Sequence, residues 1–459
     1  MTLPRELLSN LETLLGSRLS QAAADRDHHA ASESFHRAPP PDAVVWPETT
    51  EEVAAIVRAC ANAGVPVIPW GTGTSLEGHA LATQGGVTVD LSRMDKLIET
   101  RAEDMQASVQ PGMTREALNT ELRATGLFFP VDPGANASLG GMASTRCSGT
   151  TAVRYGTMRD NVRALEVVLA DGRIIRTGTR AAKSSAGYDL TGLFVGSEGT
   201  LGIITELTLR LHGQPEEVAA AICAFETLEQ AVECVTATIQ SGIPMARIEF
   251  VDDVAARAFR QYSGLDLPGT PHLLVEFHGS PGTVREDTGR FGDIASEFGA
   301  TGFDWATSPE DRNRLWRMRH GAYHACLTLR PGSTGVVTDV CVPMSHLPAA
   351  VAAAAADIRE AGLIGPIVGH VGDGNFHAQI LVEPGNDAEI AAAKQIATRM
   401  AERALAVGGT ISGEHGIGVG KRGLMAAEHG EGWQVMGAIK QALDPGNILN
   451  PGKLVPDRA

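Results

Sequence analysis

The sequence has 459 residues, of which 43% are apolar and 20% charged, so its length allows about three domains with large cores. It carries 38 Lys and Arg against 54 Asp and Glu, a formal charge of −16. This acidic balance argues against a nucleic-acid partner, because there is no basic surplus to neutralise phosphates. The six cysteines form no Cys-x-x-Cys pair, which excludes an intrinsic iron–sulfur cluster.

No apolar run reaches the roughly 18 residues that a membrane-spanning helix needs. The first residues carry Glu6 and Glu12 among leucines and lack the apolar core of a secretion signal. We therefore expect a soluble protein without a transmembrane segment, located in the reducing cytoplasm.

The N-terminal part of the chain predicts a helix, a connector, a second helix and a strand. Residues 1 to about 45 predict a short amphipathic helix followed by a polar connector from Asp25 to Pro41. Thr49 to Glu52 have the spacing of a capping box, and apolar residues follow at helical intervals until Gly64. Val65 to Pro69 then predict a strand that leads into a glycine-rich segment.

The later elements change in character part-way along the chain. Further strands are predicted at Val87–Leu91, Ala107–Gln110, Leu165–Leu169, Ile174–Ile175 and Leu201–Leu211. Asp171-Gly172 predicts a hairpin between two of these strands, and Gln214-Pro215 predicts a boundary. Beyond it, strands alternate with Ala-rich helices at Leu347–Ala361 and Asp387–Val407, which is typical of an antiparallel sheet backed by helices.

Four glycine-rich segments that follow strands are the first sign of a ligand. They are Gly71–Ser75, Val131–Gly141, Ser148–Gly156 and Val195–Thr205. Backbone amides and hydroxyls in such segments can surround a diphosphate. One alone is as well explained by an ordinary turn, and the first matches neither a P-loop nor a dinucleotide-binding motif. Four on one domain favour a large, extended, phosphate-bearing cofactor.

Two histidines flank an Asp-Gly sequence in the second half of the chain. If Gly372 to Asn375 form a four-residue hairpin loop, His370 falls directly opposite His377 on the same face. Imidazoles about 5 Å apart at Cβ can share one metal ion. A lone histidine in a strand is usually structural, whereas this matched pair favours a metal site by roughly two to one.

A later glycine-rich stretch, Ser412 to Arg422, adds two groups to this candidate site. Glu414 can supply a carboxylate, which gives two His and one Glu with open positions for substrate. The adjacent His415 is then a candidate general base rather than a fourth ligand. A polar surface loop is the alternative, but it leaves a Glu and a His among glycines unexplained.

The basic stretch from Arg312 to His320 predicts a helix with cations on more than one face, so most of them are expected to be solvated. We choose Arg319 as the cation that reaches inward to bind a substrate carboxylate. Spacing alone leaves this choice close to even.

Together these motifs make the chain similar to a known family. The most specific ones are residues 69–79, PWGTGTSLEGH; 152–161, AVRYGTMRDN; 369–377, GHVGDGNFH; 412–416, SGEHG; and 444–453, DPGNILNPGK. They cover the chain from about residue 40 to the C-terminus. In them the chain resembles the flavin-dependent D-2-hydroxyacid dehydrogenases of the vanillyl-alcohol-oxidase superfamily, and within these the cytochrome-type D-lactate dehydrogenases.

The resemblance implies an α+β fold with a two-part, PCMH-type FAD-binding domain and a C-terminal catalytic domain built on a ferredoxin-like antiparallel sheet. The implied division is residues 1–40, an N-terminal helical segment and connector; residues 41–215, the FAD-binding domain; and residues 216–459, the substrate- and metal-binding domain, in which 410–459, a helical segment, returns to the flavin.

The resemblance also implies that FAD is bound non-covalently. The expected contacts are Trp70, Gly71, Thr72, Gly73, Thr74, Ser75, Pro130, Asp132, Pro133, Ser138, Gly140, Gly141, Ser144, Ser148, Gly149, Tyr155, Gly156, Glu198, Gly199, Gly202, Ile203, Thr205 and Asn450. Lys453 belongs to the same terminal motif as Asn450. His79 lies in the first loop, but its surroundings are similar to the group that binds flavin without a covalent bond.

For the chemistry, the resemblance implies zinc or manganese held by His370, His377 and Glu414, with His415 as the base and Arg319 as the anchor of the substrate carboxylate. The expected reaction oxidises a D-2-hydroxyacid, with D-lactate favoured, to the 2-oxoacid by hydride transfer to N5 of FAD. Glycolate and D-2-hydroxyglutarate are alternative substrates within the same family.

Two other classes of protein compete with this interpretation. A metal-dependent hydrolase uses the same His, His, Glu set but leaves the glycine-rich segments without a role, and a non-catalytic flavin-binding subunit leaves the metal set without one. For the dehydrogenase we expect a small 2-hydroxyacid substrate and an external electron acceptor, which is cytochrome c, a quinone or an electron-transfer flavoprotein. A homodimer and peripheral association with the respiratory membrane are further expectations.

Overall fold

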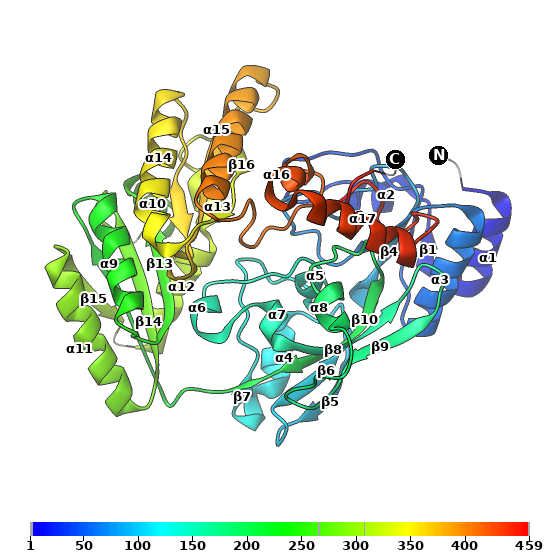
Figure 1. The fold of residues 1–459 in the computed structure, drawn as a ribbon, viewed down its shortest axis with the longest axis horizontal. Coiled ribbons are helices and arrows are strands. Elements are labelled where there is room, and N and C mark those ends of the chain that lie inside the picture. The colour runs from blue at the N-terminus through cyan, green and yellow to red at the C-terminus, as the bar shows by residue number, and fades with distance from the viewer. Residues whose placement is uncertain (1–2, 265–266, 307, 458–459) are drawn as a thin grey trace. The chain divides into compact units, whose positions relative to one another are not determined.

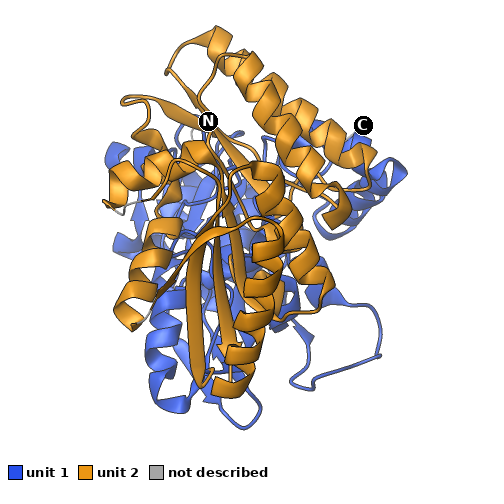
Figure 2. Ribbon diagram, turned by 90° about the vertical axis from the view of Figure 1, so that its left-hand side faces the viewer, with its two compact units in different colours: residues 1–148, 156–214, 414–459 blue, residues 149–155, 215–413 orange. Residues whose placement is uncertain are grey.

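The computed structural model describes residues 3–264, 267–306 and 308–457 (Figure 1). The chain forms two compact units, which Figure 2 shows in different colours. Unit 1 contains residues 1–148, 156–214 and 414–459, and unit 2 contains residues 149–155 and 215–413. In the part of the chain that the structure describes, no helix is both long and apolar enough to cross a membrane.

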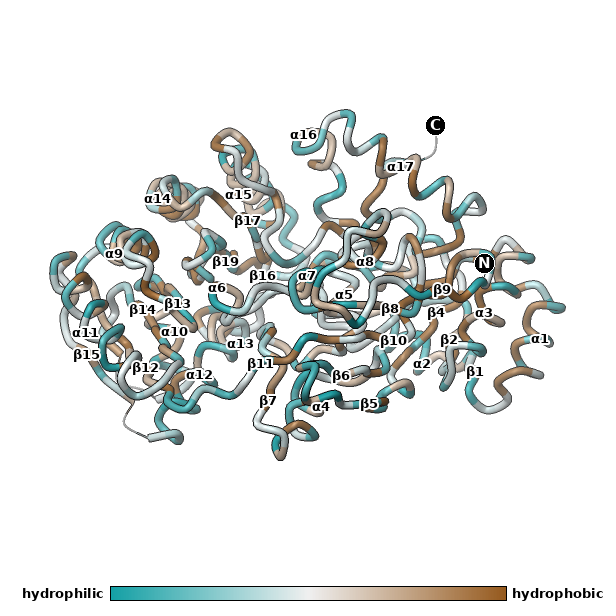
Figure 3. Tube along the Cα trace, turned by 60° about the horizontal axis from the view of Figure 1, so that its bottom comes forward, coloured by the Kyte–Doolittle hydropathy of each residue, from teal (hydrophilic) through white to brown (hydrophobic). Residues whose placement is uncertain are grey.

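Unit 1 begins with the amphipathic helix that the sequence predicts. This helix, α1 (Arg5–Leu15), buries Leu7, Leu11 and Leu15 in a core that it shares with α3 (Thr50–Ala63). In Figure 3 apolar and polar residues alternate along α1, as expected of a helix with one buried face. Packing against α3 therefore stabilises a helix that is too short to persist alone in water.

The predicted capping box at the start of α3 is only half formed. The hydroxyl of Thr49 accepts a hydrogen bond from the amide of Glu52 at 3.2 Å, as a capping residue should. The Glu52 carboxylate, however, accepts from the amide of Glu48 at 2.7 Å and pairs with Arg18. The hydrogen bond from Arg18 lowers the pKa of Glu52, although partial burial opposes this. The Glu52 carboxylate is thus shared between the Glu48 amide and a distant arginine.

Two sheets form the framework of unit 1. The four-stranded sheet has the order β1-β2-β4-β3, with β1 (Leu19–Ser20) antiparallel to its neighbour and β2 (Ala43–Val45), β4 (Val87–Asp90) and β3 (Val67–Trp70) parallel. The five-stranded sheet is antiparallel, in the order β5 (Leu97–Arg101), β6 (Gln106–Val109), β10 (Ile203–Arg210), β8 (Val162–Val168), β9 (Ile174–Gly178). The hairpin predicted at Asp171-Gly172 is confirmed, since Val168 lies opposite Ile174.

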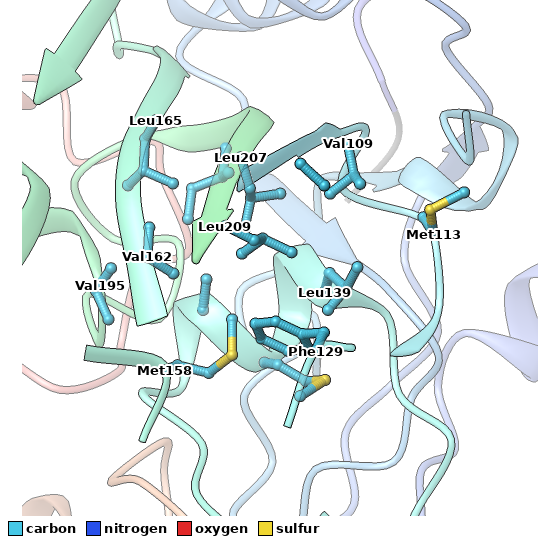
Figure 4. Close-up of a cluster of buried hydrophobic side chains, with 14 of the residues drawn as sticks. Val109, Met113, Phe129, Leu139, Met158, Val162, Leu165, Val195, Leu207 and Leu209 are labelled. Atoms are coloured by element: carbon cyan, nitrogen blue, oxygen red, sulfur yellow. The ribbon is translucent and has the colours of Figure 1, made fainter. Parts of the chain in front are cut away.

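Short helices and one small ribbon complete unit 1. They are α2 (Ala23–His28), α4 (Arg115–Glu121), α5 (Leu139–Ser144), α7 (Met158–Asn161), α8 (Leu190–Phe194), α16 (Met425–His429), α17 (Glu431–Leu443) and the ribbon of β7 (Leu127–Phe128) with β11 (His212–Gly213). Figure 4 shows the apolar core where α5 meets the five-stranded sheet, with Phe129 and Leu139 near Leu207 and Leu209. This core fixes the loops on either side of α5.

Unit 2 contains the ferredoxin-like sheet that the family resemblance implies. Its first four strands lie in the order β15 (Thr301–Ala306), β12 (Glu217–Ala224), β14 (His272–Gly279), β13 (Met245–Val251), all antiparallel. The connecting helices are α9 (Leu228–Gln240), α10 (Asp253–Ser263) and α11 (Pro281–Glu297). A helix that links the first strand to the second and another that links the third to the fourth is the ferredoxin-like arrangement, so the predicted α+β class is confirmed.

The same sheet continues through the residues of the predicted metal site. Beyond β13 follow β18 (Ile367–Gly369), β19 (Asn375–Val382) and β16 (Thr334–Val337), and β17 (Val340–Cys341) also pairs with β19. The other helices of the unit are α6 (Ala152–Tyr155), α12 (Pro309–His320), α13 (Ala322–Leu327), α14 (Leu347–Glu360) and α15 (Asp387–Ala406). Helices α14 and α15 are the two long Ala-rich helices that the sequence predicts, and each ends one residue before its predicted end.

Replacing Leu11 by Ala is expected to lower the free energy of unfolding by about 2–5 kcal/mol, because a fully buried side chain leaves a cavity. Leu14→Ala on the same helix, where the side chain is 37% exposed, should change it by less than about 1 kcal/mol. Urea unfolding followed by circular dichroism measures both variants. Equal losses would contradict the packing of α1 described above.

Candidate active site

Three of the four glycine-rich segments lie against one another in unit 1. A Cβ at Gly71, in the first segment, would fall 2.3 Å from the hydroxyl oxygen of Ser138 in the second. The amide of Glu198, in the segment Val195–Thr205, donates to the carbonyl of Ser144 at 2.8 Å. A side chain at Gly71 would displace the Ser138 hydroxyl, so the first two segments are in close contact there, and α5 links them to the segment Val195–Thr205.

The remaining segment, residues 148–156, is divided between the units. Ser148 and Gly156 belong to unit 1, whereas Gly149 and Tyr155 belong to unit 2. Helix α6 packs on β13, and the hydroxyl of Tyr155 lies 2.7 Å from Nδ1 of His278. The other expected cofactor residues, from Trp70 to Ser144, from Glu198 to Thr205 and Asn450, all lie in unit 1.

The carboxylate of Glu198 connects three parts of unit 1. It is 5% exposed and accepts hydrogen bonds from the amides of Ile417 at 2.7 Å and Gly418 at 2.9 Å. Nε2 of His79 lies 3.2 Å away. Burial acts to raise the pKa of Glu198, but His79 and the two amides together outweigh it and hold the pKa below its ordinary value. Glu198, which we expected to contact the cofactor, therefore also links separate parts of unit 1 through its side chain.

The C-terminal chain passes close beside this carboxylate. A Cβ at Gly416, where φ is +78°, would lie 2.7 Å from Nε2 of His79 and 2.8 Å from Oε1 of Glu198. Just before it, Ser148 donates to the carboxylate of Glu414 at 2.8 Å, and Nε2 of His415 lies 3.8 Å from the same carboxylate. The predicted carboxylate ligand and the predicted base are therefore both placed by the unit that carries the glycine-rich segments.

Asn450 presents a polar atom that fits a flavin. Its side-chain amide donates to the carbonyls of His79 at 2.9 Å and Glu198 at 2.7 Å, which settles the orientation of the group. Its Oδ1 is buried and has no hydrogen-bond partner among the residues that the structure describes. Such an orphaned acceptor is costly unless a ligand satisfies it, and the isoalloxazine ring carries an N–H donor. The residues present thus fit FAD.

The two predicted metal-binding histidines lie on unit 2, but in a different register from the predicted one. Val368 of β18 lies opposite His377 of β19, so the prediction that His370 lies directly opposite His377 is wrong. The two imidazole rings are nevertheless neighbours, with centroids 5.4 Å apart.

The loop between these strands explains both results. The loop begins one residue earlier than the predicted loop, Gly372 to Asn375. It is a 3₁₀ turn at Val371–Asp373 followed by Gly374 in the left-handed conformation at φ 79°. The amide of Asn375 donates to the carbonyl of His370 at 3.4 Å. His370 and His377 are therefore diagonal rather than direct cross-strand neighbours, and diagonal pairs on one face are still within reach of aromatic side chains.

His370 and His377 each contact an oxygen atom through the same ring nitrogen, Nδ1. Nδ1 of His370 lies 2.7 Å from Oε1 of Glu249, and Nδ1 of His377 lies 3.2 Å from the carbonyl of Thr338. A neutral imidazole that donates from Nδ1 presents its lone pair at Nε2. Asp339 adds a carboxylate oxygen 3.6 Å from Nδ1 of His377. Oxygen acceptors at Nδ1 are typical of histidines that bind a divalent metal through Nε2.

Arg319 points into the protein, as we predicted for one cation of its helix. It is 7% exposed at the end of α12, and Nη2 lies 2.6 Å from Oε2 of Glu249. Arg314 and Arg317 on the same helix are exposed. Nε of Arg319 has no hydrogen-bond partner in the described part of the chain, so a donor remains for a carboxylate ligand.

Sequence reasoning missed Glu249, which contacts both Arg319 and His370. The signal was present, because an acid in the apolar strand Ile248-Glu249-Phe250 has to be paired if the strand is buried. Which partners it meets depends on residues about 70 and 120 positions away, and no local pattern shows them.

Comparison with known proteins places the chain in a family. A family model described as "FAD linked oxidases, C-terminal domain" matches residues 214–454, and one described as "FAD binding domain" matches residues 41–178. The chain belongs to the FAD-linked oxidases. It is therefore a flavin-dependent oxidoreductase, and the resemblance drawn from its motifs is confirmed.

Relatives in this family are similar over nearly the whole chain. "Probable D-lactate dehydrogenase, mitochondrial" of Danio rerio is 48% identical over 98% of this chain and 91% of its own length. "D-lactate dehydrogenase [cytochrome], mitochondrial" of Arabidopsis thaliana is 44% identical over 99% and 80%. "Glycolate oxidase subunit GlcD" of Bacillus subtilis is 36% identical over 90% and 89%.

Solved structures share the fold of this FAD-linked oxidase. A p-cresol methylhydroxylase with substrate bound superposes with a TM-score of 0.81 at 18% identity, covering 98% of this chain and 97% of the other. An alkyldihydroxyacetonephosphate synthase gives 0.76 at 21% identity, over 98% and 86%. At these identities the likeness concerns the fold alone.

Lys453 lies in the same C-terminal motif as Asn450 and is 1% exposed. Its ammonium donates to the carbonyl of Leu81, and burial lowers its pKa from an ordinary 10.5 to about 7. Between those two values the unfolded chain holds a proton that the folded chain does not. Folding is therefore penalised at pH 7 and less so as the pH rises.

We expect flavin-free protein to gain stability between pH 7 and pH 10 in excess of the variant Lys453→Met, which lacks the titrating group. Urea unfolding at a series of pH values measures the difference between the two proteins. A constant difference across this range would show that the Lys453 ammonium is not penalised in the folded state.

Proposed function

We propose that this FAD-linked oxidase oxidises a D-2-hydroxyacid, with D-lactate favoured, to the corresponding 2-oxoacid. The observation that carries the proposal is the Nδ1-anchored histidine pair beside a buried arginine in unit 2. A 2-hydroxyacid offers a hydroxyl and a carboxylate, which are the groups that a divalent metal and an arginine recognise. The relatives named D-lactate dehydrogenases favour the same substrate.

Each functional side chain has one task in the proposed reaction. FAD, when bound, supplies the oxidant by accepting the hydrogen of the substrate Cα as hydride. His370, His377 and Glu414 would hold a zinc or manganese ion, which would supply the Lewis acid that lowers the pKa of the substrate hydroxyl. His415 then accepts the hydroxyl proton.

Arg319 binds the substrate carboxylate in this proposal and fixes which face of Cα is presented. A guanidinium forms two parallel hydrogen bonds to a carboxylate, which sets orientation as well as affinity. With the carboxylate and the hydroxyl both held, one enantiomer alone directs its Cα hydrogen toward the flavin. Glycolate and D-2-hydroxyglutarate carry the same two groups and remain alternative substrates.

Electrons leave the reduced flavin for an external acceptor. The names of several relatives contain the word cytochrome, which favours a cytochrome such as cytochrome c as the acceptor, and a quinone or an electron-transfer flavoprotein are the alternatives. The cytoplasmic location expected from the sequence stays a prediction, and the zebrafish and Arabidopsis relatives are named as mitochondrial proteins. Peripheral membrane association and a homodimer also stay predictions.

Anaerobic D-lactate is expected to bleach the long-wavelength flavin band of the wild-type enzyme, and His415→Ala should slow this reduction by about 100-fold or more with unchanged flavin content. Stopped-flow absorbance measures the rate. His429→Ala, at an exposed histidine on α16, is the control and should reduce normally. Reduction of His415→Ala at the wild-type rate would remove His415 from the mechanism, and no bleaching by any D-2-hydroxyacid would end the proposal.

Removing the metal tests the second part of the proposal. Dialysis against a strong chelator should abolish D-lactate oxidation while leaving FAD bound, because the proposed ligands differ from the cofactor contacts. Adding back zinc or manganese should restore activity to the wild-type enzyme and not to His377→Ala. Full activity in chelated, metal-free enzyme would contradict a metal role, and metal analysis of the same sample provides the control.

A further inference from the structure

A buried acid lies between the two functional groups of unit 2. Glu249 is on β13, is 0% exposed, and directs its two carboxylate oxygens at different partners. Oε1 lies 2.7 Å from Nδ1 of His370, and Oε2 lies 2.6 Å from Nη2 of Arg319. All three residues belong to unit 2, so their arrangement does not depend on how the units are placed.

The chemistry of this contact determines the state of the histidine. An ionised carboxylate only accepts hydrogen bonds, and the guanidinium opposite balances its charge. Nδ1 of His370 is then the donor, and Nε2 carries the lone pair that a metal needs. Pairing of Phe250 with Gly369 in the adjoining strands brings Glu249 and His370 together, so the orientation of the ring is built into the sheet.

We propose that Glu249 is a positioning residue, which fixes the tautomer and orientation of His370 for metal binding and holds Arg319 beside it. The inference rests on the proposed function, because it assigns Glu249 a role toward the metal that His370, His377 and Glu414 would bind. Partners of this kind typically change metal affinity by about 10–100-fold.

The neighbouring strand offers a matched control. Glu276 on β14 is 2% exposed and, like Glu249, pairs with an arginine and a histidine: Arg247 at 3.1 Å and His278 at 2.7 Å. Among the residues that the structure describes, its hydrogen bonds and ion pairs are with Arg247, His278 and Trp316 and not with His370, His377 or Arg319. Replacing it removes a buried carboxylate of the same kind without touching the proposed metal ligands.

The decisive measurement is the Zn²⁺ affinity of full-length, FAD-loaded and metal-free enzyme, by competition with a chromophoric chelator. Glu249→Gln is expected to weaken binding by about 10–100-fold, while Glu276→Gln leaves it unchanged. Flavin content and circular dichroism of each variant report folding. If Glu249→Gln fails to fold, Glu249→Asp takes its place, since it keeps the charge but shortens the reach to His370, and the same weakening is expected.

A double mutant separates positioning from general damage to the fold. If Glu249 acts through His370, then Glu249→Gln should cost nothing further in Zn²⁺ affinity once His370→Ala has removed the ligand. In the His377→Ala background the full loss should persist, because His370 is still present there.

The outcomes distinguish this inference from the proposed function. Wild-type enzyme that binds no Zn²⁺ overturns the metal part of the proposed function and the inference with it. Wild-type binding together with unchanged affinity in Glu249→Gln overturns the inference alone. An equal loss in Glu276→Gln, or an undiminished loss in the His370→Ala background, also overturns it.

Discussion

In unit 1, one buried carboxylate holds together segments that are far apart in the sequence. Glu198 lies in the glycine-rich segment Val195–Thr205, contacts His79 from the loop after the first segment, and accepts hydrogen bonds from the amides of Ile417 and Gly418. Ile417 and Gly418 come shortly after Glu414 and His415 in the same segment of the chain. Because a buried carboxylate is stable only when it is fully paired, the pairing that stabilises Glu198 also fixes the path of the predicted base.

Unit 2 uses a buried acid in a comparable way. Glu249 is stable inside the sheet because Arg319 and His370 pair with it, and the same contacts hold both side chains in place. The contacts that stabilise the buried Glu249 carboxylate therefore also orient the two side chains of the proposed site. Asn450, which we expect at the flavin, and His377, which we propose as a metal ligand, are each already held by protein atoms on another side.

Much of the local structure could be predicted from the sequence. The α1 and α3 helices, the hairpin at Asp171-Gly172 and the long helices α14 and α15 follow from periodicity, capping and turn residues, which act within a few positions of the chain. Two local predictions failed. The Glu52 carboxylate pairs with the distant Arg18 and does not complete the capping box, and the register of β18 and β19 differs from the predicted one by two residues, since Val368 and not His370 lies opposite His377.

The sequence by itself determined the family, the types of side chain at the site and the elements that carry them, because these depend on residue identity and short spacings. Only the tertiary structure decided that Glu249 meets both Arg319 and His370, and that Glu198 receives the amides of the C-terminal segment. These contacts join positions separated by tens to hundreds of residues. Strand order and the packing of sheets bring them together, and no local pattern in the chain encodes that packing.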